Sequence, residues 1–252
     1  MDILTSKANG IFTITFNRPN KKNAITAAMY QAMADALKEA EGDAEVRAIL
    51  LTGSPEIFTA GNDLEDFLKN PPQKRNSPVY QFMRNLSQAT KPVIAAVSGP
   101  AVGIGTTLLM HCDFVYAADN AKFSMPFAKL GLCPEFSSSM LLPQIAGYQR
   151  AAEKLMLGEA FSAQEACAMG LVNKVLPTAE LFAFAQVQAA KLAALPTSSL
   201  RATKHLMKGK QLAAIEAKME EEGQLFSEML KSKEAKEAFT AFFEKRKPDF
   251  TK

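Results

Sequence analysis

Two uninterrupted apolar segments of strand length set the strongest limit on how this chain folds. Residues 48–52 read AILLT and residues 93–97 read VIAAV. Such a strand carries apolar side chains on both sides, so other elements must cover both faces of its sheet. The chain is therefore predicted to form an α/β core in which these two strands are buried.

The segments around these strands show both helical and strand patterns. IFTITF at 11–16 alternates as a strand, and Thr26 is expected to cap a helix that reaches about Glu41. Further helices are expected at 64–69 (ended by a turn at 70–73), 78–89 and 106–112, and further strands at 113–117 and 122–124. From Gly147 onward the chain is expected to be nearly all helix, with Thr178, Ser198 and Ser232 as caps.

The composition excludes several classes of protein. With 48% hydrophobic and 22% charged residues, the chain is not expected to be disordered, and its net charge of +3 gives no case for binding nucleic acid or an anionic membrane. Apolar runs are all too short for a membrane-spanning helix. Two histidines and three scattered cysteines disfavour a metal site and a thiol mechanism, so carboxylates and backbone groups are expected to carry any catalysis.

Two strand-to-helix junctions are rich in small or polar residues. At residues 58–64 (FTAGNDL), unpaired amides are able to bind an oxyanion or a phosphate, whereas the alternative is a simple turn with Asn62 or Asp63 as the helix cap. At residues 98–105 (SGPAVGIG), the glycines allow either close approach to a ligand or close packing of a helix on a strand.

Glu135 is the carboxylate that most resembles a catalytic base. It is the only charged residue between Gly131 and Gln149, and apolar surroundings raise the pKa of a carboxyl group toward neutrality. The alternative is that Glu135 caps a helix beginning at Phe136 and faces water. His111 is expected to be a core residue, and the apolar face of the last helix (Phe239, Phe242 and Phe243 among its residues) to seal a pocket or a subunit contact.

Taken together, these segments resemble the enoyl-CoA hydratase/isomerase (crotonase) superfamily along essentially the whole chain. The similarity rests on ITFNRPNKKNAI, LTGSPEIFTAGNDLEDF, KPVIAAVSGPAVGIGTTLLMHCDFVYA, FSMPFAKLGLCPEFSSSMLLPQIAG and GEAFSAQEACAMGLVNKVLP, in that order. The AGNDL, GPAVGI and PE-x-SS patterns are most similar to those of the peroxisomal-type Δ3,Δ2-enoyl-CoA isomerases. The resemblance implies an α/β spiral of repeated ββα units over residues 1–195, followed in the same folding unit by a helical region at 196–252 for oligomerisation and pocket cover.

The resemblance also implies the site residues. Backbone N–H groups of Asn62 and Ile104 are expected to bind the thioester oxygen of an acyl-CoA. The CoA portion is expected along Ala60, Gly61, Asn62, Asp63 and Leu64, with Lys22 and, more loosely, Lys21 near its phosphates. No metal and no separate cofactor is implied, because CoA is part of the substrate.

Departures from the family pattern favour one reaction over another. The two glutamates that hydratases of this family use fall at Thr107 and Phe127, counted from Cys112-Asp113, and neither residue transfers a proton. Glu135 matches the single carboxylate of the isomerases, so the expected activity shifts a 3-enoyl-CoA double bond to trans-2-enoyl-CoA. Phe127, Met125 and Leu132 are expected to line a dry acyl pocket.

The alternatives are an atypical hydratase or other acyl-CoA lyase, and a non-catalytic acyl-CoA-binding protein. The family implies a homotrimer or a dimer of trimers. Because KPDFTK differs from an SKL-type peroxisomal signal, a cytoplasmic location is expected.

Overall fold

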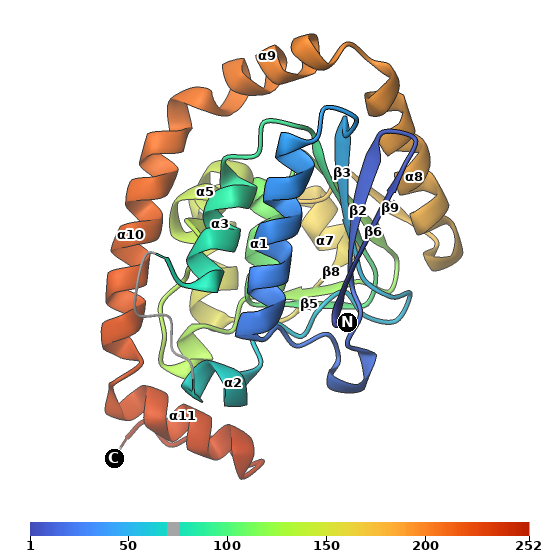
Figure 1. Cartoon of the computed structure of the whole chain (residues 1–252). Coiled ribbons are helices and arrows are strands. Elements are labelled where there is room, and N and C mark those ends of the chain that lie inside the picture. Colours follow the sequence, from blue (N-terminus) through green and yellow to red (C-terminus); the bar gives the residue numbers. More distant parts are fainter. Residues whose placement is uncertain (70–75, 252) are drawn as a thin grey trace.

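The computed structural model describes residues 1–69 and 76–251 and shows an α/β protein built on two sheets (Figure 1). The larger sheet has the order β1-β2-β3-β4-β6-β9, with bounds Ile3–Ala8, Ile11–Phe16, Ala48–Thr52, Val93–Val97, Phe114–Ala118 and Lys174–Leu176. The smaller sheet has the order β5-β7-β8, with bounds Pro100–Val102, Lys122–Ser124 and Phe161–Ser162. The α-helices are α1 Ala27–Gly42, α2 Leu64–Lys69, α3 Pro78–Ser87, α4 Ile104–Thr107, α5 Ser138–Ala146, α6 Tyr148–Ala152, α7 Ala163–Ala168, α8 Thr178–Ala194, α9 Thr197–Lys208, α10 Leu212–Met229 and α11 Lys233–Phe243.

The two apolar strands lie in the middle of the larger sheet, as predicted. β3 and β4 pair in parallel with each other and with their outer neighbours, and every residue of both strands is buried. Ile49 and Leu51 belong to the apolar core that includes α1, whereas Ala48 and Leu50 pack into a second cluster with α8. The helices therefore cover both faces, which is why neither strand alternates (Figure 1).

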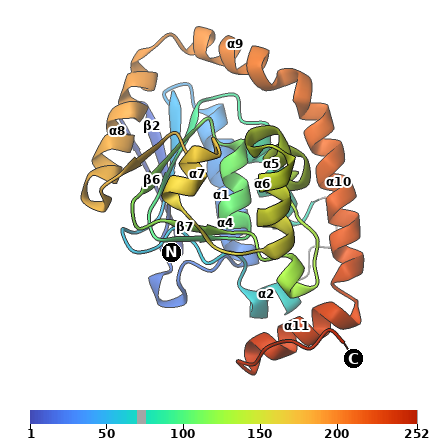
Figure 2. The same cartoon turned by 180° about the vertical axis from the view of Figure 1, so that it is seen from behind.

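The C-terminal helices wrap around this core as an outer arc. α9 passes over one end of the molecule, α10 runs along its side, and α11 crosses the opposite end close to α2 (Figures 1 and 2). α10 contacts α3, and α11 contacts the 3₁₀ turn Ala128–Leu130. No helix among residues 1–69 and 76–251 is long and apolar enough to cross a membrane.

Several expected elements are observed with different details. The helix predicted after Thr26 forms, with the Thr26 side chain accepting a hydrogen bond from the Met29 amide, and Ser232 likewise caps α11. The helix predicted at 64–69 also forms, whereas the turn predicted at 70–73 lies outside the described residues. Thr178 is not a cap, because α8 begins at that residue after Pro177 and its hydroxyl donates to Asp119 instead.

Ser198 lies within the first turn of α9, which follows Pro196, so this predicted cap is also wrong. Short or exposed strands were not predicted from the sequence. β8 and β9 lie in the region expected to be nearly all helix, and β1 precedes the first predicted strand. β1 is an edge strand with five exposed residues, so it lacks the apolar pattern by which strands are recognised.

Candidate active site

The two strand-to-helix junctions singled out in the sequence are packed against each other. Thr59 forms a parallel bridge with Ala101, through hydrogen bonds from the Thr59 amide to Pro100 and from the Val102 amide to Thr59. Gly61 has a φ of +84°, and a Cβ at this position would lie 2.6 Å from the Val102 carbonyl oxygen. The first turn therefore needs glycine for both its backbone conformation and its packing.

The second turn is equally close to the first. A Cβ on Gly105 would lie 2.5 Å from the Thr59 methyl group, so this glycine allows close helix packing. A Cβ on Gly103 would meet no atom within 4 Å, although its φ is +56°. Of the two uses of glycine left open by the sequence, packing accounts for Gly105, and the turn conformation accounts for Gly103.

The amides of Asn62 and Ile104 lie at these junctions. The bridge between Ile25 and Asn62 uses the Gly61 carbonyl and the Asp63 amide. Ile104 begins α4 directly after Gly103, so its N–H precedes the helical hydrogen-bond pattern. Among the residues that the structure describes, neither N–H has a hydrogen-bond acceptor. Both groups remain available to bind an oxygen anion.

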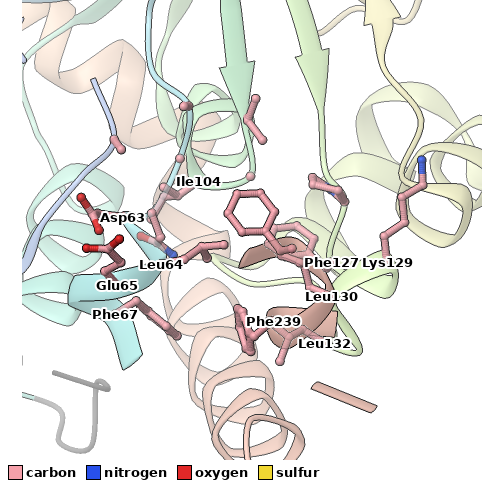
Figure 3. Close-up of a pocket in the computed structure, with 18 of the residues that line it drawn as sticks. Asp63, Leu64, Glu65, Phe67, Ile104, Phe127, Lys129, Leu130, Leu132 and Phe239 are labelled. Atoms are coloured by element: carbon pink, nitrogen blue, oxygen red, sulfur yellow. The ribbon is translucent and has the colours of Figure 1, made fainter. Parts of the chain in front are cut away.

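A cavity of about 580 Å³ opens beside the two junctions. Every residue expected along the CoA portion lines it: Lys21, Lys22, Ala60, Gly61, Asn62, Asp63 and Leu64. Figure 3 shows Leu64 and Phe67 on one side and Phe127, Leu130 and Phe239 on the other. The cavity thus combines an apolar lining with three exposed lysines, Lys21, Lys22 and Lys129.

Of the three side chains expected in the acyl pocket, two line a cavity at the site and one does not. Phe127 and Leu132 line the large cavity, together with Phe239, Phe242 and Phe243 from the end of the chain. Met125 is fully buried in the core and lines neither described cavity near the site, so its expected role is wrong.

Glu135 lines a second, smaller cavity of about 40 Å³. Asn62, Phe67, Ile104 and Phe226 line both cavities, so the two unpaired amides belong to residues at their boundary. This arrangement brings the expected base and the two expected amide donors into one site. It does not match the alternative in which Glu135 caps a helix at Phe136, because α5 begins at Ser138.

The surroundings of Glu135 favour its neutral form. Burial raises the pKa of this carboxyl group to about 8, and Glu222 adds to the rise. Thr107 opposes the shift, since its hydroxyl donates to Glu135 Oε1 at 2.5 Å. A group with this pKa exists in both protonation states near neutral pH, as a general base that must also return a proton requires.

The backbone after Glu135 adopts an uncommon conformation. Phe136 and Ser137 have φ values of +58° and +57°, which side-chain-bearing residues rarely adopt. The Phe136 ring stacks on His111 at a centroid distance of 3.9 Å, and His111 Nε2 lies 2.8 Å from the Phe136 carbonyl oxygen. Burial lowers the pKa of His111 to about 3, so the ring is neutral and Nε2–H donates. His111 is the expected core residue, although its Nδ1 has no partner among the described residues.

Sequence reasoning missed three polar side chains of this site. Tyr30 donates a 2.5 Å hydrogen bond to Asn62 Oδ1, Tyr80 lines the small cavity, and Glu222 binds the backbone after Glu135. Glu222 lies between Met219 and Phe226 at helical spacing, on the buried face of α10. That periodicity was the available signal, since a charged residue on an apolar face is seldom there without a partner.

The remaining candidates take structural roles. Asp63 forms an ion pair with Arg18 at 2.8 Å and accepts a hydrogen bond from the Asp66 amide, so this residue does act as the cap of α2. Burial raises the pKa of Cys112 to about 12 and that of Cys133 to about 11, which keeps both thiols protonated. Within the described part of the chain, no group of three or more His, Cys, Asp or Glu residues is placed to hold a metal ion.

Comparison with known proteins places these features in a family. The model of the family described as "Enoyl-CoA hydratase/isomerase" matches residues 6–252. Enoyl-CoA delta isomerase 2 of Rattus norvegicus is 39% identical over 226 residues, which cover 87% of this chain and 58% of that protein. The chain therefore spans little more than half the length of that relative.

Two further relatives match along their whole length. The 1,2-epoxyphenylacetyl-CoA isomerase of Escherichia coli (strain K12) is 36% identical over 256 residues, covering 99% of this chain and 98% of that protein. A crystal structure described as an enoyl-CoA hydratase/isomerase from Pseudoalteromonas atlantica T6c is 39% identical, covers 100% of both chains and superposes with a TM-score of 0.96. The fold is thus the α/β crotonase fold with a C-terminal helical region, as expected.

Proposed function

The chain belongs to the enoyl-CoA hydratase/isomerase superfamily, and from this we propose that it is an acyl-CoA enzyme that converts 3-enoyl-CoA to trans-2-enoyl-CoA. The observation that carries the proposal is the position of Glu135. It is a half-buried carboxylate with a pKa near 8, in a cavity bounded by the residues whose amides are unpaired. The names of relatives include both isomerases and a hydratase, so the choice rests on the site.

In the proposed reaction, the thioester oxygen accepts hydrogen bonds from the Asn62 and Ile104 amides. Ionised Glu135 removes a proton from C2, and the electron pair of that C–H bond moves into a dienolate whose charge rests on the oxygen. Each preorganised donor of this kind typically contributes about 3 kcal/mol to stabilising the transition state. Protonated Glu135 then delivers the proton to C4, which forms the conjugated product and regenerates the carboxylate.

The residues at the positions of the hydratase glutamates support isomerisation over hydration. The Thr107 hydroxyl donates to Glu135 and carries no carboxylate to activate a water, and Phe127 contributes an aromatic ring to the large cavity. Hydration needs one group to activate water and one to protonate the α-carbon, whereas isomerisation needs one group that does both proton transfers. An atypical hydratase or other acyl-CoA lyase is the second candidate, because the superfamily contains hydratases.

The CoA portion is proposed to occupy the large cavity. Its apolar lining suits the pantetheine chain, and Lys21 and Lys22 at the rim suit the phosphates. Phe239, Phe242 and Phe243 of the C-terminal region would then cover this part of the substrate. The trimeric assembly, the division at residue 195 and the cytoplasmic location stay predictions.

The deciding experiment supplies 3-enoyl-CoA and 2-enoyl-CoA separately and follows conjugation of the first and loss of conjugation of the second. We expect rapid conjugation of the 3-enoyl substrate by the native chain and by Glu159→Gln, an exposed control on the surface. Glu135→Gln should abolish conjugation while leaving binding of the CoA thioester nearly unchanged. Rapid hydration of 2-enoyl-CoA without any shift of the 3-enoyl double bond would reject the isomerase in favour of the hydratase.

A further inference from the structure

Glu222 is a buried carboxylate that approaches the proposed base from a distant part of the sequence. It lies on α10, and its side chain is among the few buried charged groups of the chain. Oε2 accepts a hydrogen bond from the Ser137 amide at 2.6 Å. Oε1 accepts from the Ser139 amide at 3.0 Å and from the Ser139 hydroxyl at 2.5 Å. Both oxygens are thus occupied by donors, an arrangement that suits an ionised carboxylate.

These hydrogen bonds hold the strained segment that orients Glu135. Phe136 and Ser137 both have positive φ values, at a cost of about 1 to 2 kcal/mol for each residue, and they lie between Glu135 and the start of α5. The Ser137 amide and the Ser139 amide of this segment both donate to Glu222. The Ser137 hydroxyl donates to the Ile215 carbonyl at 2.8 Å, so α10 holds the segment at two places.

Glu222 is also a second negative charge beside the base. Around Glu135, the other titratable groups are Tyr30 on α1, Tyr80 on α3, Cys133 two residues before it and the neutral His111 beneath Phe136. Burial raises the pKa of Glu222, whereas the hydrogen bonds from Ser139 and Ser137 and the charge of Lys218 favour its ionised form. Lys218 lies one helical turn before Glu222 and donates to Glu221 at 2.5 Å. Among these groups, Glu222 is the carboxylate whose negative charge disfavours the ionised form of Glu135.

We propose that Glu222 is a positioning residue for the reaction: its carboxylate fixes the backbone at residues 136–139 so that Glu135 reaches the substrate, and it places a second carboxylate beside Glu135. The proposal rests on the proposed role of Glu135 as the base. It adds that the C-terminal helix α10 supplies a part of the catalytic machinery that touches neither substrate nor cofactor.

Glu222→Gln tests both parts of this role, with Glu221→Gln as the matched control. The neighbouring Glu221 is exposed and faces Lys218, so the same substitution there should change nothing in the site. In Glu222→Gln, an amide NH₂ replaces one acceptor oxygen and faces a backbone donor. The maximal isomerisation rate at high pH should fall about tenfold, as expected when a reacting group is misplaced, whereas KM should stay within about twofold. The pKa of Glu135 should fall by about one unit, because a like charge has been removed.

The pKa of Glu135 is read without turnover, by the pH titration of its side-chain ¹³C carboxyl resonance, assigned with Glu135→Gln. A lower rate with an unchanged Glu135 pKa would reduce Glu222 to a purely structural role and overturn the proposal. So would an unchanged rate. If Glu222→Gln does not fold, Glu222→Asp carries the test: the rate should fall while the pKa of Glu135 is retained, and an unchanged rate would be contrary to the proposal. If the native chain fails to isomerise 3-enoyl-CoA, the proposed function fails, but the ¹³C titration still decides the coupling.

Discussion

Thr107→Val removes the hydroxyl that donates to Glu135 and leaves a side chain of nearly the same shape. The Thr107 hydroxyl is fully buried and lies 2.5 Å from Glu135 Oε1. Because this bond is made to the charged form of the carboxyl group, it lowers the pKa of Glu135. The substitution should therefore raise that pKa above its present value of about 8.

The size of the effect follows from the strength of such bonds. A hydrogen bond to a charged group contributes about 1.5 to 3 kcal/mol, and one pKa unit corresponds to about 1.4 kcal/mol. Loss of the hydrogen bond from Thr107 should thus raise the pKa of Glu135 by about one unit. At pH 7, the ionised fraction of Glu135 would fall from roughly one tenth to roughly one hundredth, and kcat/KM would fall about tenfold. Above about pH 9.5 the difference should shrink to less than about 1.5-fold.

The assay is the initial rate of 3-enoyl-CoA conjugation, measured from about pH 5.5 to about pH 9.5. Thr107→Ser keeps the hydroxyl and is the matched control, so its acid limb should coincide with that of the native chain. An acid limb in Thr107→Val that is unmoved, or that shifts to lower pH, would refute the reasoning. It would mean either that the hydroxyl does not stabilise the charged base or that Glu135 is not the titrating group.

Three other perturbations have defined outcomes. Glu135→Gln should be more stable than the native chain by about 3 to 5 kcal/mol above about pH 8, and equally stable below about pH 4.5. The reason is that Glu135 has a higher pKa in the folded than in the unfolded chain, so the native chain loses stability as the pH rises from the unfolded pKa to the folded pKa. Urea unfolding at both pH values checks this, and an equal gain at both would contradict it. Gly61→Ala places a Cβ 2.6 Å from the Val102 oxygen at positive φ and should cost about 3 kcal/mol by the same measurement, against about 1 kcal/mol for Gly103→Ala, which only has the backbone strain. Lys22→Gln should raise the KM for the CoA thioester about two- to fivefold at low salt with kcat unchanged, and a kcat effect alone would argue against phosphate binding there.

The large elements were predictable because they depend on local patterns. AILLT and VIAAV are buried strands, and Thr26 caps the helix that follows it. Two of the missed elements are β1, which is exposed and pairs with the next strand β2, and β9, which has three residues and pairs with the distant β6. Their formation depends on register in the sheet rather than on their own composition.

The candidate site was predictable in its parts but not in its arrangement. The sequence identified Glu135 and the two glycine turns, and the resemblance assigned amide donors to Asn62 and Ile104. It did not reveal that Thr107 binds Glu135 or that Asp63 is paired with Arg18. These contacts join residues 28 and 45 positions apart, and no local pattern encodes them.

By itself, the sequence indicated the α/β class and the family, and it singled out Glu135 as the candidate base. Only the tertiary structure brought α10 against the segment after Glu135, so that Glu222 binds the Ser137 and Ser139 amides across more than 80 residues of chain. The physical reason is that the pKa of a carboxyl group is set by burial, hydrogen bonds and nearby charges, all of which exist only after the chain has folded. A sequence shows which residues are able to carry a proton, and the packing of distant helices sets the pH at which each of them does so.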